Sequence, residues 1–192
     1  MKVTAIETVR VAEFPNLLWV QVVTDEGIVG LGETFYGAAA AEGHIHGLIA
    51  PYLIGKDPRN IERHQAHLVG YIGFSSASAE MRGRSAVDIA LWDILGQSAG
   101  LPLCDLLGGR VRDAIKVYNT CAGYSYVQTQ ATQGTDNFGL KAKTGQYEDL
   151  DAFLHRADEL AHSLLEMDIT AMKIWPLDYA AEASSGHWIS HA

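Results

Sequence analysis

The 192-residue sequence lacks the features that identify several large classes of protein. It contains only two cysteines, Cys104 and Cys121, without a CxxC spacing, so a disulfide-stabilised miniprotein is excluded. No apolar run approaches the roughly 20 residues of a membrane span. Glu7 and Arg10 lie where a secretion signal would have an uncharged apolar core. We therefore expect two reduced thiols and a cytoplasmic protein that does not bind membranes.

Positive charge is also scarce. Lysine and arginine together number 14 against 23 aspartates and glutamates, which gives a net charge of −9 with neutral histidines. An acidic chain without a basic cluster disfavours nucleic acid as a partner. Since 48% of the residues are hydrophobic and 19% are charged, the composition predicts a folded core and excludes a disordered chain.

Motifs of several common functional sites are absent. The chain has no GxGxxG, P-loop or GxSxG motif and no ligand set with zinc spacing. Eight histidines are present, but no close pair of them is completed by a neighbouring acidic or thiol ligand. We therefore expect no histidine-based metal site.

The sequence opens with three segments typical of β-strands. They cover residues 3–11, 17–24 and 28–35, and short turns separate them. Connections of this length favour an antiparallel meander over parallel crossovers. The sequence therefore predicts a small antiparallel sheet at the N-terminus.

Helix-type sequence follows the strands in three stretches: 38–49, 61–69 and 79–99. Pro51 is expected to lie just beyond the end of the first, and Asn60 to cap the second. Gly100 provides the stop signal of the third, on which Arg84 and Asp88 lie four residues apart and predict an ion pair. Together with the strands, these helices predict an α+β domain.

After about residue 112 the pattern changes to a β-α-β order. Strand-type sequence at 114–122 precedes one amphipathic helix at 150–165 and a second strand at 169–175. A right-handed parallel crossover is the default geometry of such a unit. One unit of this kind does not make a domain, because its strands need parallel neighbours.

Lys173 lies in the C-terminal half of the second of these strands, and alternation puts Trp175 on the same side. The carboxyl ends of parallel strands form the ligand-facing rim of α/β sheets and barrels. Desolvation and nearby cations at that rim would lower the pKa of a lysine and make it a general base. An ordinary lysine at a strand edge is the alternative.

Two long stretches resemble the mandelate racemase/muconate lactonizing enzyme family of the enolase superfamily. They are SAVDIALWDILGQ at 85–97 and GLPLCDLLGG at 100–109. The segments GLGET at 30–34, DEG at 25–27 and LIGKDP at 53–58 are also similar to that family. The resemblance therefore extends over nearly the whole chain.

This resemblance implies two domains. Residues 1–112 would form the α+β capping domain, a three-stranded antiparallel meander followed by helices. Residues 113–192 would form the truncated start of a (β/α)₈ TIM barrel, an incomplete β-α-β portion. A whole barrel needs about 250 residues, so the chain is too short to contain one.

The implied activity is Mg²⁺-dependent removal of the proton α to a carboxylate, as in a racemase, a cycloisomerase or an acid-sugar dehydratase. The substrate would be a hydroxy acid or acid sugar. The family's metal ligands lie on the third, fourth and fifth barrel strands, so we expect this chain to bind no Mg²⁺ tightly and to be inactive alone. A non-catalytic capping, binding or oligomerisation domain is the alternative, and assembly into a homo-oligomer is left open.

The resemblance also implies individual site residues. The family often places a Lys-x-Lys motif at the end of the second barrel strand, where Lys173 matches the first lysine and Trp175 replaces the second, which is commonly the base. Either Lys173 is the base or an electrostatic partner, or a later residue does this work. Two capping-domain loops that help to select the substrate match 13–16 and 35–37, so Phe14, Tyr36 and Trp175 are the predicted substrate-binding residues.

Overall fold

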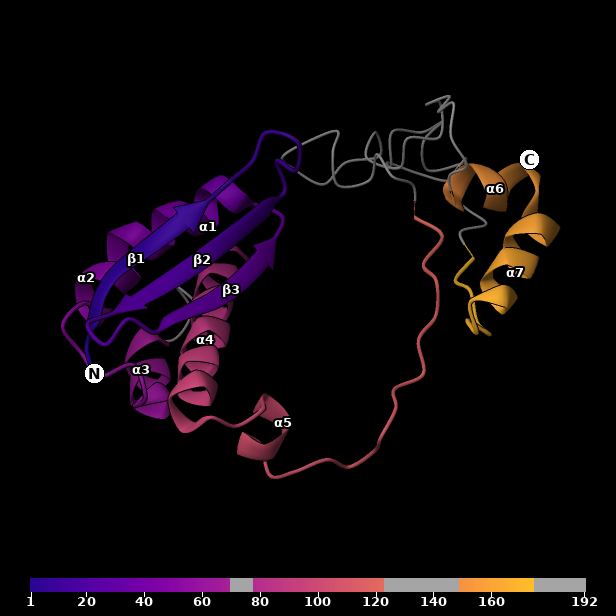
Figure 1. Ribbon diagram of the computed structural model, residues 1–192. Coiled ribbons are helices and arrows are strands. Elements are labelled where there is room, and N and C mark those ends of the chain that lie inside the picture. The colour runs from indigo at the N-terminus through magenta and orange to yellow at the C-terminus, as the bar shows by residue number, and fades with distance from the viewer. Residues whose placement is uncertain (70–77, 123–148, 175–192) are drawn as a thin grey trace. The chain divides into compact units, whose positions relative to one another are not determined.

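The computed structural model describes residues 1–69, 78–122 and 149–174 (Figure 1). The chain divides into two compact units, Met1–Val111 and Arg112–Ala192. Among the residues described, no helix combines the length and the apolar character that a membrane span requires. The two units are considered in turn.

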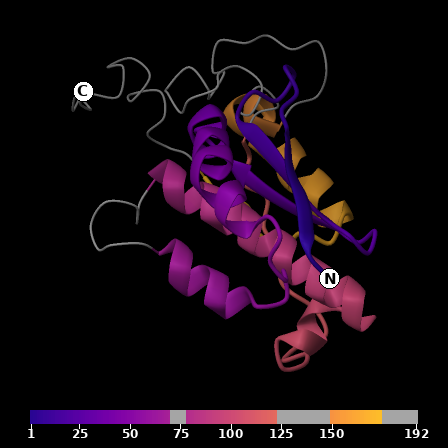
Figure 2. The ribbon, with the colours of Figure 1, turned by 90° about the vertical axis from the view of Figure 1, so that its left-hand side faces the viewer.

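Unit 1 begins with the predicted antiparallel meander. Strands β1 (Val3–Val9), β2 (Leu17–Thr24) and β3 (Val29–Phe35) form one sheet in the order β1-β2-β3. Along β2 the side chains of Leu18, Val20 and Val22 are fully buried, while those between them are partly exposed. The helices of the unit cover this buried face (Figure 2). The fold class predicted for this part of the chain is confirmed.

The helices of unit 1 follow the sheet in sequence. They are α1 (Ala38–His44), the π-helical turn η1 (Ile45–Ile49), α2 (Ala50–Leu53), α3 (Ile61–Leu68), α4 (Ser78–Ala99) and α5 (Leu103–Leu106). The prediction that the first helix ends before Pro51 is wrong, because Pro51 lies inside α2. The π-helical turn before it widens the hydrogen-bond ladder, as the Ala50 N–H to Ile45 C=O bond shows, and so accommodates a residue that has no N–H.

Two glycines of β3 allow α4 to lie directly on the sheet. A Cβ atom on Gly30 would lie 2.1 Å from the carbonyl oxygen of Ala90, and one on Gly32 would lie 1.9 Å from that of Ala86. Any side chain at these two positions would therefore push the helix away. The strand-to-helix contact fixes where the first turns of α4 stand relative to the end of β3.

The predicted ion pair between Arg84 and Asp88 is not present. Buried Arg84 instead donates to the carbonyl oxygen of Leu68 at 3.0 Å, and Asp88 accepts from Nε2 of Gln65 at 2.8 Å. The acceptor of the first bond and the donor of the second both belong to α3. The two side chains therefore connect α4 to α3 and do not pair with each other. Burial raises the pKa of Asp88. Asn60 does occupy the N-cap position of α3, but its side chain makes no capping hydrogen bond.

The described part of unit 2 contains two helices where the sequence predicts one. Helix α6 (Asp149–His155) and helix α7 (Ala157–Glu166) are separated by Arg156 alone, which has φ −148°. The ladder continues across it, since Arg156 donates to Ala152 at 2.7 Å and Leu160 donates to Arg156 at 3.1 Å. The apolar side of both helices packs on a small core of four buried residues: Cys121, Ala152, Leu160 and Leu164.

The two predicted strands of this unit are reduced to a single contact. An isolated parallel bridge joins Asn119 to Met172, and elsewhere in 114–122 and 169–174 no strand forms. Ile115 and Val117 are 75% and 56% exposed. The pairing is parallel, as predicted, but two short segments without further neighbours do not make a regular ladder.

Candidate recognition site at one end of the sheet

The two loops predicted to face a substrate lie at the same end of the sheet. In an antiparallel meander the end of β1, the start of β2 and the end of β3 lie at the same end of the sheet (Figure 1). Leu17 pairs with Phe35 at this end. The backbone N–H of Tyr36 donates to the carbonyl oxygen of Asn16 at 2.9 Å. The structure therefore brings the loops of Phe14 and Tyr36 together.

Within the first loop, Phe14 is half-buried. Its N–H donates to the carbonyl oxygen of Val11 at 3.1 Å, and its own carbonyl oxygen accepts from the N–H of Leu17 at 3.0 Å. These two bonds close a compact turn between β1 and β2. The aromatic ring is thus carried by a turn of fixed backbone rather than by a long loop.

Tyr36 begins the turn that leads from β3 into α1. Tyr36 has φ 63° and Gly37 has φ 66°, so two consecutive residues are left-handed. The ring of Tyr36 lies 3.8 Å from that of Phe35 between centroids, and the guanidinium carbon of Arg82 lies 5.9 Å from the Tyr36 ring centroid. Arg82 also donates to the carbonyl oxygen of Phe35. This side chain of α4 therefore contacts the turn twice.

Asn16 is a polar residue of this end that the sequence analysis missed. Its side chain is 0% exposed, and neither its Nδ2 nor its Oδ1 has a hydrogen-bond partner in the described structure. The sequence carried a signal, since Asn16 is in phase with buried Leu18 and Val20 and is therefore on the covered face. Buried polar groups are normally paired, so this carboxamide is an unused donor and acceptor.

A cavity of about 320 Å³ adjoins the end of β3. The residues that line it are Thr34, Ser78, Met81, Arg82 and Ser85. Three hydroxyls and one guanidinium give it the donors and acceptors that a polyhydroxylated anion requires. The sequence analysis missed this group too, although positions 78, 82 and 85 are spaced i, i+4, i+7 and share one face of a helix.

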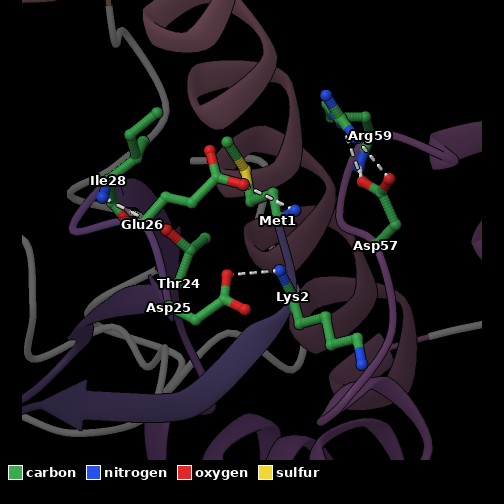
Figure 3. Close-up of polar contacts among 8 residues, drawn as sticks. All are labelled: Met1, Lys2, Thr24, Asp25, Glu26, Ile28, Asp57 and Arg59. Atoms are coloured by element: carbon green, nitrogen blue, oxygen red, sulfur yellow. Dashed lines mark hydrogen bonds and ion pairs between the residues drawn. The ribbon is translucent and has the colours of Figure 1, made fainter.

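The opposite end of the sheet is closed by polar contacts within the chain (Figure 3). There the hydroxyl of Thr24 donates to the Ile28 carbonyl oxygen at 2.8 Å and accepts from the Ile28 N–H at 3.1 Å. The N-terminal ammonium group pairs with Glu26 at 2.6 Å. Thr24 and Asn16 are the buried polar residues at the two ends of β2, but of their two side chains only that of Thr24 has hydrogen-bond partners in the described structure.

Near this closed end, Arg59 pairs with Asp57 at 2.7 Å (Figure 3). The guanidinium group lowers the pKa of Asp57 to about 2. His64 is buried next to it, between the hydroxyl of Tyr52 at 3.1 Å and the carbonyl oxygen of Asp57 at 2.8 Å. Both ring nitrogens are therefore engaged in structural contacts, which leaves none of them for a metal.

Lys173 belongs to unit 2, where it is exposed and directly follows the parallel bridge. Its backbone N–H donates to the carbonyl oxygen of Asn119 at 2.8 Å, and the Asn119 side chain donates to Asp149 at 2.8 Å. Burial raises the pKa of the neighbouring Cys121 thiol, which therefore stays protonated at neutral pH. Trp175 lies outside the described residues.

No metal centre is found in the part of the chain that the structure describes. Within residues 1–69, 78–122 and 149–174, no group of three or more histidine, cysteine, aspartate or glutamate side chains could hold a metal ion. Magnesium prefers oxygen ligands in octahedral geometry, usually including carboxylates. The residues described do not fit that ion.

The arrangement of a three-stranded meander followed by helices matches a known domain. The sequence model of the mandelate racemase/muconate lactonizing enzyme N-terminal domain matches residues 2–108. The chain belongs to this family. The family resemblance noted in the sequence is therefore confirmed.

The chain is similar to a curated enzyme and to proteins of known structure. It is 36% identical to a D-mannonate dehydratase of Novosphingobium aromaticivorans over 76% of this chain and 37% of that protein. A crystal structure of an enolase of the mandelate racemase subgroup from Agrobacterium tumefaciens is 50% identical, with a TM-score of 0.74, over 99% of this chain and 42% of that one. An enolase from Pantoea ananatis, crystallised with bound D-gluconate and Mg, is 36% identical, with a TM-score of 0.56, over 62% of this chain and 30% of that one.

The chain thus spans less than half the length of each of these relatives. Magnesium occurs in the family, as the gluconate complex shows.

Proposed function

We propose that this chain supplies the capping portion of a Mg²⁺-dependent enzyme that removes the proton α to the carboxylate of an acid sugar, as a dehydratase or racemase. Family membership and the similarity to a D-mannonate dehydratase support this reaction class. The acid sugar bound to the Pantoea ananatis enolase supports the substrate class. Within such an enzyme, the domain at 1–112 would close over the substrate and 113–192 would begin the barrel.

The observation that carries the proposal is the junction of the two loops by the Tyr36–Asn16 backbone bond of 2.9 Å. Two aromatic side chains, Phe14 and Tyr36, which are 22 residues apart in sequence, thus lie at the same end of the sheet. Aromatic rings pack against the apolar C–H faces of a sugar, while polar groups between them recognise its hydroxyls. We assign Phe14 and Tyr36 the first of these tasks.

The polar task is assigned to the carboxamide of Asn16 and the cavity beside Thr34. Since the Asn16 side chain is 0% exposed, a substrate hydroxyl would reach its unpaired donor and acceptor only if the turn around it moved. Arg82 adds a positive charge at the cavity, which suits a substrate that is an anion. The proposed role of these groups is to bind the substrate, and none of them has a proposed role in proton transfer.

For the proton transfer itself, Lys173 is the residue proposed, either as the base or as an electrostatic partner. Its support is its position immediately after a parallel bridge, which corresponds to the carboxyl end of a strand pair. Trp175 is proposed as a further substrate contact. If Lys173 has neither role, the base lies elsewhere in the enzyme and the capping role of unit 1 still holds.

A chimera tests the capping role. Residues 2–108 of this chain replace the corresponding segment of the Novosphingobium aromaticivorans D-mannonate dehydratase, and dehydration of D-mannonate is measured with Mg²⁺. We expect activity, and a KM raised about tenfold by Tyr36→Ala, since loss of one buried aromatic contact removes roughly 1.4 kcal/mol of binding. Phe14→Ala should act in the same direction.

The matched control is Val29→Ala, at the opposite end of β3 from the turn that carries Tyr36, and it should leave KM unchanged. A folded chimera without activity would contradict the proposal and favour a non-catalytic capping or oligomerisation domain. The 192-residue chain alone, with Mg²⁺ in D₂O, should exchange no α-proton of D-mannonate. Turnover in that sample would contradict the expectation that this chain is inactive alone.

A further inference from the structure

The turn that carries Tyr36 has a backbone conformation that its sequence disfavours. Tyr36 and Gly37 have φ values of 63° and 66°. Glycine adopts this conformation freely, but the Cβ of a tyrosine crowds the following carbonyl oxygen. Residues held in this way persist only where the surrounding structure fixes them. The contacts that fix Tyr36 therefore decide where its ring points.

Arg82, on the first turns of α4, provides two of these contacts. Its Nη1 donates to the carbonyl oxygen of Phe35, and its guanidinium carbon lies 5.9 Å from the centroid of the Tyr36 ring. We propose that Arg82 is a positioning residue that holds the Tyr36 turn in its left-handed conformation. The backbone bond from Tyr36 to Asn16 then fixes the same turn from the other side.

An arginine on this helix is suited to that task. The guanidinium group is planar and carries five donors, so it can donate to a carbonyl oxygen and contact an aromatic ring at once. Its helix is itself held in place, because Gly32 of β3 allows the backbone of α4 to lie directly on the sheet. Gly83, beside Arg82, likewise lies against the carbonyl oxygen of Ala41 in α1, with 3.2 Å left for a Cβ. A rigid element thus positions a strained turn.

The consequence for substrate selection rests on the proposed function, in which Tyr36 contacts the sugar. Arg82 would then set the pose of the tyrosine ring in addition to the positive charge that it places at the cavity. The geometry of the turn, however, is measurable in the 192-residue chain without any substrate. Failure of that measurement would remove the positioning role alone, and failure of the chimera would remove the acid-sugar role alone.

The test is amide hydrogen exchange by NMR in the full chain, with Arg82→Ala, Arg82→Met and Arg82→Lys. In the Ala and Met variants the Tyr36 amide should exchange about tenfold faster, since a charged hydrogen bond and a ring contact are lost. The Lys variant keeps a donor and a cation, and its Tyr36 amide should stay within about threefold of the parent. The control is Arg63→Ala, an exposed arginine of α3, which should change nothing at Tyr36.

Amides of the sheet core, at Val20 and Val22, show whether an effect is local. Faster exchange at Tyr36 with unchanged core amides, restored by lysine, supports the positioning role. Unchanged exchange at Tyr36 in the Ala and Met variants, or equal acceleration at Tyr36 and in the core, overturns it. If the Ala variant does not fold, the comparison of Met with Lys decides between these outcomes.

Discussion

Unit 1 and the described part of unit 2 differ in how completely each buries its apolar residues. In unit 1, side chains from the sheet and from five helical elements form one core, which includes Leu18, Val20, Leu53 and Leu91. In unit 2, four residues make up the buried cluster, while Ile115 and Ile174 are 75% and 62% exposed. The difference shows that a strand-type sequence pattern forms a regular strand only where neighbouring strands and a covering layer are present.

The first prediction concerns the strand-to-helix contact of unit 1, which has no counterpart in the described part of unit 2. Gly32→Val should destabilise unit 1 by at least about 4 kcal/mol, because its Cβ would stand 1.9 Å from the Ala86 carbonyl oxygen and the backbone of α4 would have to move. Thermal unfolding followed by circular dichroism measures this effect.

The control for that prediction is Gly43→Ala in α1, where an added Cβ meets nothing within 4 Å. Alanine is the better helix former, so this variant should keep or gain up to about 1 kcal/mol. If both glycine variants have the same stability, α4 does not lie on β3 as described.

The second prediction compares one buried leucine from each unit. Leu91→Ala should cost about 3 kcal/mol and Leu160→Ala about 2 kcal/mol, since both are 0% exposed but Leu160 belongs to the smaller of the two described clusters of buried side chains. Urea unfolding with separate probes for the two units measures both values.

The units should also respond independently. Leu160→Ala should leave the unfolding midpoint of unit 1 unchanged, because the two cores share no residue. An equal shift of both transitions in either variant would show one cooperative core and remove the distinction between the units.

The third and smallest effect depends on pH. The pKa of Asp57 lies at about 2, below the 3.8 that it has without its partner, so the Asp57–Arg59 pair stabilises the fold above pH 4 and this contribution is lost as the pH falls towards 2. Asp57→Asn should therefore lower Tm by less than about 2 °C at pH 7 and by a smaller amount at pH 2, where the carboxyl is only partly ionised.

Glu7→Gln, which changes an exposed carboxylate of β1, serves as the control and should alter Tm at neither pH. A larger loss for Asp57→Asn at pH 2 than at pH 7 would reverse the sign and contradict the role assigned to the pair.

The sequence predicts unit 1 better than unit 2 for a physical reason. Alternation at Leu18, Val20 and Val22 and short turns are local signals, and the sheet they predict is present. The strands expected at 114–122 and 169–175 depend on neighbours that a local pattern does not supply, and one bridge is what forms in the described residues. No local feature of the sequence predicts the break between α6 and α7 at Arg156 either.

The candidate site shows the same division. The family resemblance singles out the loops of Phe14 and Tyr36, and the structure brings them together at one end of the sheet. Arg82 was missed because its contact with Phe35 joins residues 47 apart, through a packing that depends on Gly30 and Gly32. Asn16 was missed although its phase along β2 indicates burial, because nothing in the sequence shows that its carboxamide lacks a partner.

Amide hydrogen exchange across the whole 192-residue chain tests most directly whether the two units differ as described. We predict strong protection of Val20 and Val22 in β2, with exchange at 117–120 and 172–174 faster by at least about a hundredfold, since one isolated bridge joins the latter segments. Protection in both of those segments equal to that of β2 would contradict this, and would mean that unit 2 forms a complete sheet of its own.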